Sequence, residues 1–316
     1  MRKGLSYDDV LVVPNRSEIN SRSDINITST ILPGITLSVP IISAPMDSVT
    51  GSELAQSMAD LGGVGIIHRF CTPEEQADMV SEVDGLVGAS IGIGSGELDR
   101  ANTCIDAGAD FICIDVAHGH LEDCLDFTEE FDEIFDYPLM VGNVATHEAA
   151  EELYESGADC VKVGVGPGSH CTTRTKTGVG VPQFTAVRST EHTSPRVVAD
   201  GGIRTPGDAV KALMGGANAV MMGGAFGRCE ESLHDGVWGM ASQKGKEQSN
   251  SDGYIEGRES SVDEKTTVDE VMENYIDGIR SGMSYIGGHT IDEARENASF
   301  VEITATTRER NGAFIK

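Results

Sequence analysis

The chain has 316 residues, and 39% of them are hydrophobic, which is enough for a sizeable core. Its 51 acidic residues outnumber 23 basic ones, and the resulting net charge of −28 excludes nucleic acid and anionic membrane as partners because both need basic patches. No stretch approaches the roughly 18 apolar residues of a membrane span, and the first residues lack the apolar stretch of a signal peptide. We therefore expect a cytoplasmic protein.

Short apolar runs recur along the chain after residue 39, with starts about 20 to 37 residues apart, which is the spacing of strand–helix units. Most of the runs are continuously apolar, as expected for parallel strands that are buried on both faces. The predicted strands are Ile41–Ala44, Val64–Ile67, Leu86–Ala89, Phe111–Ile114, Pro138–Val141, Cys160–Val163, Val197–Ala199 and Ala219–Met222.

Amphipathic stretches between these runs predict helices, among them Pro73–Val83, Leu98–Ala107 and His147–Ser156. Several helices end in similar glycine-containing segments, and glycine suits the left-handed residue that closes a helix. Eight such units predict an α/β fold, a single (β/α)8 TIM barrel over residues 1–316, with a doubly wound open sheet as the alternative. Residues 1–39 would cover the barrel, and residues 228–289 would form a long excursion after the eighth strand.

The barrel interpretation predicts catalytic groups at the C-terminal ends of the strands. Each predicted strand is followed by a polar residue or a glycine, which packing alone does not explain. These residues are Asp47, His68, Ser90, Asp115, Asn143, Gly164, Asp200 and Gly223.

The loop after the sixth strand carries the most specific pattern, in which Gly164, Gly166 and Gly168 precede Cys171. Alternating glycines let the backbone approach a ligand closely, and consecutive N–H groups suit an anion. The seven cysteines show no metal or disulfide spacing and predict reduced thiols. Arg174 would favour the thiolate of Cys171, which is the better nucleophile.

Two later strand ends complete a predicted nucleotide cradle. Asp200 stands beside Gly201 and Gly202, where a carboxylate could bind a ribose diol, although it could also be a helix N-cap. Gly223 and Gly224 follow the eighth strand, where barrels commonly bind phosphate.

With these motifs in place, the sequence resembles the IMP dehydrogenase/GMP reductase family over essentially its whole length. The Cys171 loop is the most specific part of the resemblance. The other matching segments are Leu5–Leu11, Ser43–Asp47, Gly63–His68, Asp115–His120 and Arg280–Met283.

The resemblance implies that Cys171 attacks C2 of a purine nucleotide, while Thr173 and Glu256 form a proton relay. Glu256 could instead be one more acid on an acidic surface. Ser169, Gly202, Gly223 and Gly224 would hold the phosphate, Asp200 the ribose, and Gly239 and Met240 the base. The implied nucleotide-binding set is completed by Ser43, Met46 and Gly201.

The resemblance also implies a nicotinamide cofactor, expected to be NADPH, with NADH as the alternative. The residues expected to line its site are Asp115, Val116, Ala117, Asn143, Lys162 and Gly164. Carbonyl groups of Gly166, Gly168 and Cys171 match a possible K⁺ site, and the family suggests a homotetramer.

Two reactions are open within the family: reduction of GMP to IMP and ammonia, and oxidation of IMP to XMP. Dehydrogenases use a flap with an Arg-Tyr pair to activate water, whereas the 15 residues between Met240 and Glu256 contain no arginine. The chain also lacks room after Arg69 for paired regulatory (CBS) domains. We expect a GMP reductase, with a dehydrogenase lacking CBS domains as the alternative and a non-catalytic nucleotide-binding barrel as a third possibility.

The acidic residues are spread along the whole chain rather than gathered in a tail. This distribution favours a halophilic source, in which a charged surface keeps the protein soluble at high salt. An ordinary acidic cytosolic protein is the alternative.

Overall fold

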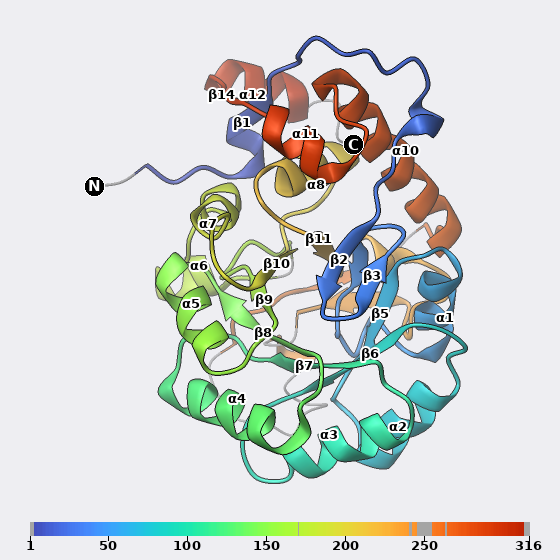
Figure 1. Cartoon of the computed structure of the whole chain (residues 1–316). Coiled ribbons are helices and arrows are strands. Elements are labelled where there is room, and N and C mark those ends of the chain that lie inside the picture. The colour runs from blue at the N-terminus through green and yellow to red at the C-terminus, as the bar shows by residue number, and fades with distance from the viewer. Residues whose placement is uncertain (1–2, 170, 240–241, 245–254, 263, 313–316) are drawn as a thin grey trace.

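Eight parallel strands form a closed barrel in the order β10-β11-β4-β5-β6-β7-β8-β9 (Figure 1). The structure is a computed structural model, and it describes residues 3–169, 171–239, 242–244, 255–262 and 264–312. The barrel strands are β4 Ile41–Ser43, β5 Val64–Ile67, β6 Val87–Ile91, β7 Phe111–Asp115, β8 Leu139–Val144, β9 Cys160–Val163, β10 Arg196–Asp200 and β11 Ala219–Met222.

All eight predicted strands are confirmed, and because the sheet closes on itself the open-sheet alternative is wrong. Helices surround the barrel (Figure 1). They are α1 Ser52–Asp60, α2 Pro73–Ser81, α3 Glu97–Asp106, α4 Glu122–Phe135, α5 His147–Glu155, α7 Gln183–Ser189, α8 Pro206–Met214 and α10 Val268–Ile286. Gly108 and Gly157 follow α3 and α5 with positive φ angles of 105° and 109°, as the repeated helix endings predicted.

The N-terminal segment covers one end of the barrel. Its hairpin pairs β2 Ser29–Leu32 with β3 Ile35–Leu37. The apolar side chains of this hairpin share one core cluster with side chains from the barrel strands. Earlier in the chain, η1 Tyr7–Asp9 and η2 Arg22–Asp24 flank β1 Val10–Val12, which pairs with β14 Phe300–Glu302. The predicted cover is therefore fastened partly by a strand from the C-terminal part of the chain.

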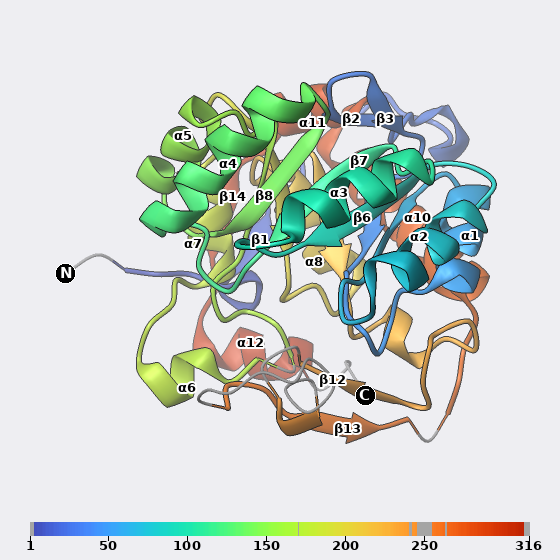
Figure 2. The same ribbon diagram turned by 90° about the horizontal axis from the view of Figure 1, so that it is seen from below.

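The excursion after β11 begins with η3 Phe226–Arg228 and contains the antiparallel pair β12 Gly236–Trp238 and β13 Glu259–Ser261. Figure 2 shows this pair and α6 Thr173–Thr177 at the end of the barrel opposite to the β2–β3 hairpin. The excursion was predicted to run to residue 289, and that boundary is wrong.

Helix α10 packs against α8 and α1, so it is the last barrel helix rather than part of the excursion. Its sequence carries the usual determinants of a helix. Thr267 and Glu270 form a capping box, and the buried face repeats every three or four residues. Helices α11 Ile291–Asn297 and α12 Ala305–Gly312 follow. Among the described helices, none combines the length and apolar character that crossing a bilayer demands.

Candidate active site

The loop after β9 reaches the barrel mouth through Gly164, which has no space for a side chain. A Cβ on Gly164 would lie 2.1 Å from the carbonyl oxygen of Asp200, so only glycine allows this approach. Gly166 has a φ of 80°, in the left-handed region. The loop ends at Cys171, which is exposed, whereas the other six cysteines are buried or half-buried.

The Cys171 loop is joined by backbone hydrogen bonds to the segment that precedes β13. The Thr172 N–H donates to the carbonyl oxygen of Glu256 at 2.7 Å, and Cys171 forms an antiparallel bridge with Gly257. The Cys171 sulfur lies 3.1 Å from the Thr173 hydroxyl. The structure thus brings together the segments that carry all three predicted catalytic residues, although they are far apart in the sequence.

The Arg174 side chain donates hydrogen bonds to backbone carbonyl groups on both sides of the same loop. Its Nη2 donates to the carbonyl of Val181 at 2.6 Å, and its Nε donates to that of Val165 at 3.4 Å. Burial lowers the pKa of the Arg174 guanidinium, and the nearby Cys171 acts in the opposite direction. Arg174 therefore holds the shape of the loop that carries Cys171 through these two hydrogen bonds.

A buried lysine connects the ends of four strands at the barrel mouth. The Lys162 ammonium donates to Asp115 at 2.5 Å and to Asp200 at 3.3 Å, and it also donates to the side-chain oxygen of Asn143. The Asn143 amide nitrogen donates to Asp200 at 2.7 Å and to the Gly164 carbonyl at 2.8 Å. Residues expected separately on the cofactor and ribose sides thus form one network.

The charge of Lys162 is maintained by its partners, since its side chain is only 2% exposed. Burial would lower the pKa of this ammonium, but the carboxylates of Asp115 and Asp200 outweigh burial and raise it. Lys162 is therefore a permanent cation between two carboxylates. Asp200 is 22% exposed, which leaves part of its carboxylate facing the mouth.

Asp200 is not a helix N-cap, because α8 is capped by Thr205. That alternative is wrong. Gly201 and Gly202 after it have φ angles of 86° and 78°, where a side chain would be strained. Gln183 was not predicted: its amide nitrogen donates to the carbonyls of Val163 and Asp200, which ties β9 to β10. A single glutamine at the start of a helix gives no sequence pattern that would have revealed it.

The remaining predicted nucleotide contacts lie on neighbouring strand ends. Ser43 is buried and accepts a hydrogen bond from Thr50 at 2.9 Å. A Cβ on Gly223 would lie 2.5 Å from the sulfur of Met46, so these two residues touch. Other predicted positions on the barrel-mouth loops or the excursion are Val116, Ala117, Ser169, Gly224 and Gly239. Met240 lies outside the described residues.

The three carbonyls expected to bind K⁺ belong to one turn. The carbonyl of Gly168 accepts the N–H of Cys171 at 3.0 Å, so it could offer an ion only its second lone pair. The K⁺ site stays a prediction.

A match to the IMP dehydrogenase / GMP reductase domain covers residues 4–313. The chain belongs to this family. Family membership and the barrel fold expected from the sequence are therefore confirmed.

The similar proteins include both enzymes of the family. The chain is 35% identical to inosine-5'-monophosphate dehydrogenase of Cryptosporidium parvum, covering 96% of this chain and 93% of that one. It is 30% identical to the enzyme of that name from Nitrosopumilus maritimus, with 96% of each covered. Among solved structures, a variant of GMP reductase from Trypanosoma brucei in complex with guanosine 5'-monophosphate matches with a TM-score of 0.94, 26% identity and 98% coverage of both chains.

The comparisons make this chain an oxidoreductase of the family without choosing between its two reactions. The alignment with the Nitrosopumilus enzyme extends over 459 positions, more than the 316 residues of this chain, so that relative carries inserted segments. The T. brucei structure is matched almost from end to end.

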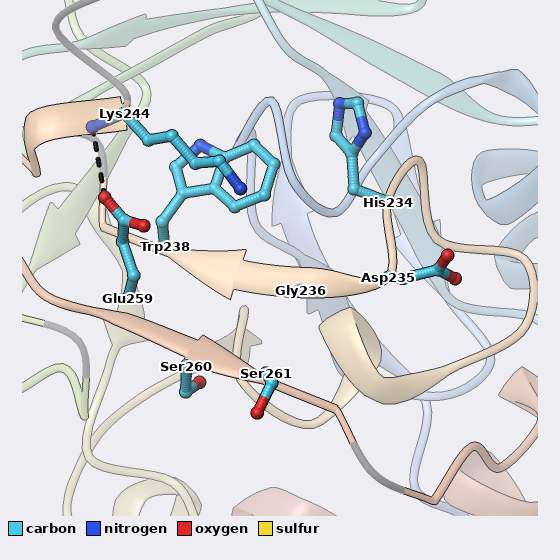
Figure 3. A pocket seen from close by; sticks show the side chains of 8 residues that line it. All are labelled: His234, Asp235, Gly236, Trp238, Lys244, Glu259, Ser260 and Ser261. Carbon is cyan, nitrogen blue, oxygen red and sulfur yellow. Dashed lines mark hydrogen bonds between the residues drawn. The ribbon is translucent and has the colours of Figure 1, made fainter.

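A cavity of about 460 Å³ lies beside β12 and β13 and was not predicted (Figure 3). Its lining includes Trp238, His234, Lys244 and Glu259, together with Asp235, Gly236, Ser260 and Ser261. None of the residues predicted for the active site lines this cavity. It therefore belongs to the excursion rather than to the Cys171 loop.

Proposed function

We propose that this protein is a GMP reductase, which converts GMP to IMP and ammonia through a covalent bond between Cys171 and C2 of the purine. The observation that carries this proposal is the contact of the exposed Cys171 sulfur with the Thr173 hydroxyl, on a loop bonded to the Glu256 backbone. A nucleophile, a hydroxyl and a carboxylate-bearing segment are thereby gathered at the barrel mouth.

In the first half-reaction the Cys171 sulfur forms a bond to C2 of GMP, and the bond from C2 to the amino group breaks. The amine leaves as ammonia and takes up the proton lost by the thiol. Thr173 and Glu256 supply the path for that proton. Positioned proton transfer of this kind typically contributes about 10²–10⁴-fold in rate.

In the second half-reaction a hydride arrives at C2, the carbon–sulfur bond breaks, and the released thiolate takes up a proton. A reduced nicotinamide cofactor, NADPH or alternatively NADH, would supply the hydride when bound. Asp115, Asn143 and Lys162 fit a polar ring substituent because their hydrogen bonds fix them at adjacent strand ends. Val116, Ala117 and Gly164 would complete that side.

The nucleotide cradle would place the phosphate at Ser169, Gly202, Gly223 and Gly224, and the ribose at Asp200. Ser43, Met46, Gly201, Gly239 and Met240 would complete it. The exposed part of the Asp200 carboxylate supports the ribose assignment, because its other interactions hold that group in place. We also propose a cytoplasmic homotetramer adapted to high salt, with K⁺ as a possible ligand of the Cys171 loop.

The alternative reaction, oxidation of IMP to XMP with NAD, requires hydrolysis of the Cys171 adduct. The segment between Met240 and Glu256 contains no arginine that could help to activate water. The match to a reductase structure with a TM-score of 0.94 supports reduction, whereas the higher identity to named dehydrogenases, which are covered over 93% and 96% of their length, supports the alternative.

Product analysis tests the proposal. The enzyme is incubated with GMP plus NADPH or NADH, and separately with IMP plus NAD, and the products are separated by chromatography. We expect IMP and ammonia from GMP, and negligible XMP from IMP. Glu256→Gln should block ammonia release while GMP still binds. Efficient XMP formation would overturn the reductase assignment.

A further inference from the structure

Trp238, the only tryptophan of the chain, links the excursion to the loop that follows barrel strand β4. It is the last residue of β12 and is 2% exposed. Its indole N–H donates to Oδ2 of Asp47 at 3.0 Å. The Ser48 hydroxyl lies 3.4 Å from both the backbone nitrogen and the carbonyl oxygen of Trp238. The side chain and the backbone of Trp238 are therefore both in contact with the segment that contains Asp47 and Ser48.

The Asp47 carboxylate is buried, and the Trp238 indole is the side chain that donates a hydrogen bond to it. It is 4% exposed, and its second oxygen, Oδ1, is buried without a hydrogen-bond partner in the described part of the chain. Burial raises the pKa of the Asp47 carboxyl, and the Trp238 hydrogen bond is the largest of the interactions that oppose this rise; the others come from His234 and from the backbone N–H groups of Ser48 and Asp47. Removing the indole N–H would take the side-chain donor away from Oδ2 of a buried carboxylate, which is costly.

The sheet anchored by Trp238 also holds the Cys171 loop. Trp238 pairs with Glu259 across β12 and β13, and the N–H of Gly239 donates to the Arg258 carbonyl at 3.2 Å. Arg258 Nε in turn donates to the carbonyl of Ser169 at 2.7 Å. The Thr172–Glu256 bond then joins the loop to the same segment. A continuous chain of contacts leads from Asp47 to the nucleophile.

The faces of the indole ring are packed separately from its N–H. The Lys244 ammonium lies 4.3 Å from the ring centroid, and the His234 ring lies 4.9 Å from it (Figure 3). Lys244 therefore contacts Trp238 without forming part of the link to Asp47, and it provides a matched control.

We propose that Trp238 is a positioning residue: its bond to Asp47 sets the place of the β12–β13 sheet over the barrel mouth, and thereby the place of Glu256 and the Cys171 loop. Trp238 acts through those groups and touches neither substrate nor cofactor in this scheme. The link to turnover rests on the proposed function, but the positioning itself can be measured without any activity.

Amide hydrogen exchange followed by mass spectrometry tests the positioning directly. The peptide containing Thr172 is compared in the wild type, Trp238→Phe, Asp47→Ala, Asp47→Asn and Lys244→Ala. We expect exchange about five-fold faster or more in Trp238→Phe and Asp47→Ala, since leaving a buried hydrogen-bonding group unpaired favours local opening by roughly an order of magnitude. Asp47→Asn keeps an oxygen acceptor for the indole and should restore protection, and Lys244→Ala should match the wild type.

Peptides from helix α3 should exchange alike in all five proteins, which separates local opening from unfolding of the barrel. Unchanged exchange of the Thr172 peptide in Trp238→Phe and Asp47→Ala would overturn the proposal. So would faster exchange in Asp47→Asn equal to that in Asp47→Ala, because the charge rather than the bond would then matter.

Turnover gives a second reading. Trp238→Phe and Asp47→Ala should lower kcat about ten-fold with a much smaller change in the KM of the nucleotide, and the double variant should be no worse than either single one. Additive losses would contradict a shared link. Lack of GMP turnover in the wild type would count against the proposed function, whereas the exchange experiment would still decide the positioning role.

Discussion

The two ends of the barrel differ in what fills them. At the N-terminal end, Ile31, Leu32, Ile35 and Leu37 of the β2–β3 hairpin close the barrel with apolar side chains. At the C-terminal end, glycines, the Lys162 network and the Cys171 loop gather polar and reactive groups. One end is therefore filled by apolar packing, whereas the other, which holds the candidate active site, contains buried paired charges.

The cysteines show the same contrast. Cys113 and Cys160 lie inside the barrel, fully buried in the cluster that includes the hairpin, and burial raises the pKa of both thiols far above the usual range. Cys171 is exposed at the other end. A thiol in the core behaves as a small apolar side chain, whereas a thiol at the mouth can react.

The largest expected effect comes from removing the exposed thiol rather than a buried one. Cys171→Ala should lower turnover by roughly 10³-fold or more, because the covalent route is lost, while nucleotide binding remains measurable by calorimetry. Cys113→Ala is the matched control, and it should lower the free energy of unfolding through lost burial while leaving turnover near that of the wild type. A Cys171→Ala enzyme that keeps more than about a twentieth of the rate would exclude covalent catalysis.

The next effect concerns the closed end. Leu32 is fully buried under the barrel, so Leu32→Ala should lower the free energy of unfolding by about 2–5 kcal/mol in urea denaturation. Turnover of the folded enzyme should stay within about two-fold of the wild type because the hairpin lies far from the mouth. A large loss of turnover without a loss of stability would show that the two ends are not separate.

The barrel was predictable because its signals are local. Each strand is a short apolar run, and each helix has its own period and end, so neither depends on distant residues. The eighth barrel helix, α10, has the same local pattern of a cap and a periodic apolar face. The predicted excursion extended too far because residues 228–289 were interpreted as one insertion, which included this helix. The pairing of β1 with β14 joins the two ends of the sequence and has no local pattern.

The sequence suggests which residues belong to the candidate site, and their roles stay predictions, but it does not show how their side chains are arranged. Strand-end positions and the family resemblance pointed to Lys162, Asp115 and Asp200, yet nothing in the sequence indicates that one ammonium bridges both carboxylates. The Thr172–Glu256 bond and the Trp238–Asp47 bond each join residues far apart in the chain. Such contacts depend on the three-dimensional path of the loops, and a local sequence pattern does not reveal that path.

A smaller effect concerns a buried histidine near the barrel mouth and the pH dependence of the free energy of unfolding. His68, at the end of β5, is 7% exposed, and burial lowers its pKa to about 4, with His234 and Arg100 adding to the decrease. Its Nδ1 accepts the N–H of Phe70 at 3.1 Å, which fits the neutral ring. Between its unfolded pKa of roughly 6.5 and about 4, only the unfolded chain takes up this proton, so His68 costs stability as the pH falls.

The loss should approach the order of 3 kcal/mol at acidic pH, measured as the free energy of unfolding at pH values near 7 and 4.5. His68→Asn, which can keep an acceptor for the Phe70 N–H, should show a smaller decrease over the same interval. Equal decreases in the two proteins would mean that His68 does not titrate as described.

The smallest effect concerns exposed acidic side chains that, unlike the charges at the barrel mouth, form no ion pair within the described part of the chain. Helix α4 carries seven acidic residues and no basic one, among them Asp126 and Glu130, one helical turn apart and both exposed. Screening lengths fall from about 30 Å at 0.01 M to about 3 Å at 1 M salt, whereas buried pairs such as Lys162–Asp115 are screened much less.

With a net charge of −28, we expect the melting temperature to rise by several degrees as KCl increases, since roughly 1 kcal/mol corresponds to about 2–4 °C in a chain of this size class. Asp126→Asn with Glu130→Gln should raise the melting temperature at low salt and flatten the response, because like charges at this spacing repel. Glu18→Gln is the control: its carboxylate pairs with Arg16 at 3.0 Å, so removing it should bring no such gain. A melting temperature independent of KCl between 0.01 and 1 M would contradict the proposed adaptation to salt and would mean that repulsion between unpaired surface acids contributes little to the stability of this barrel.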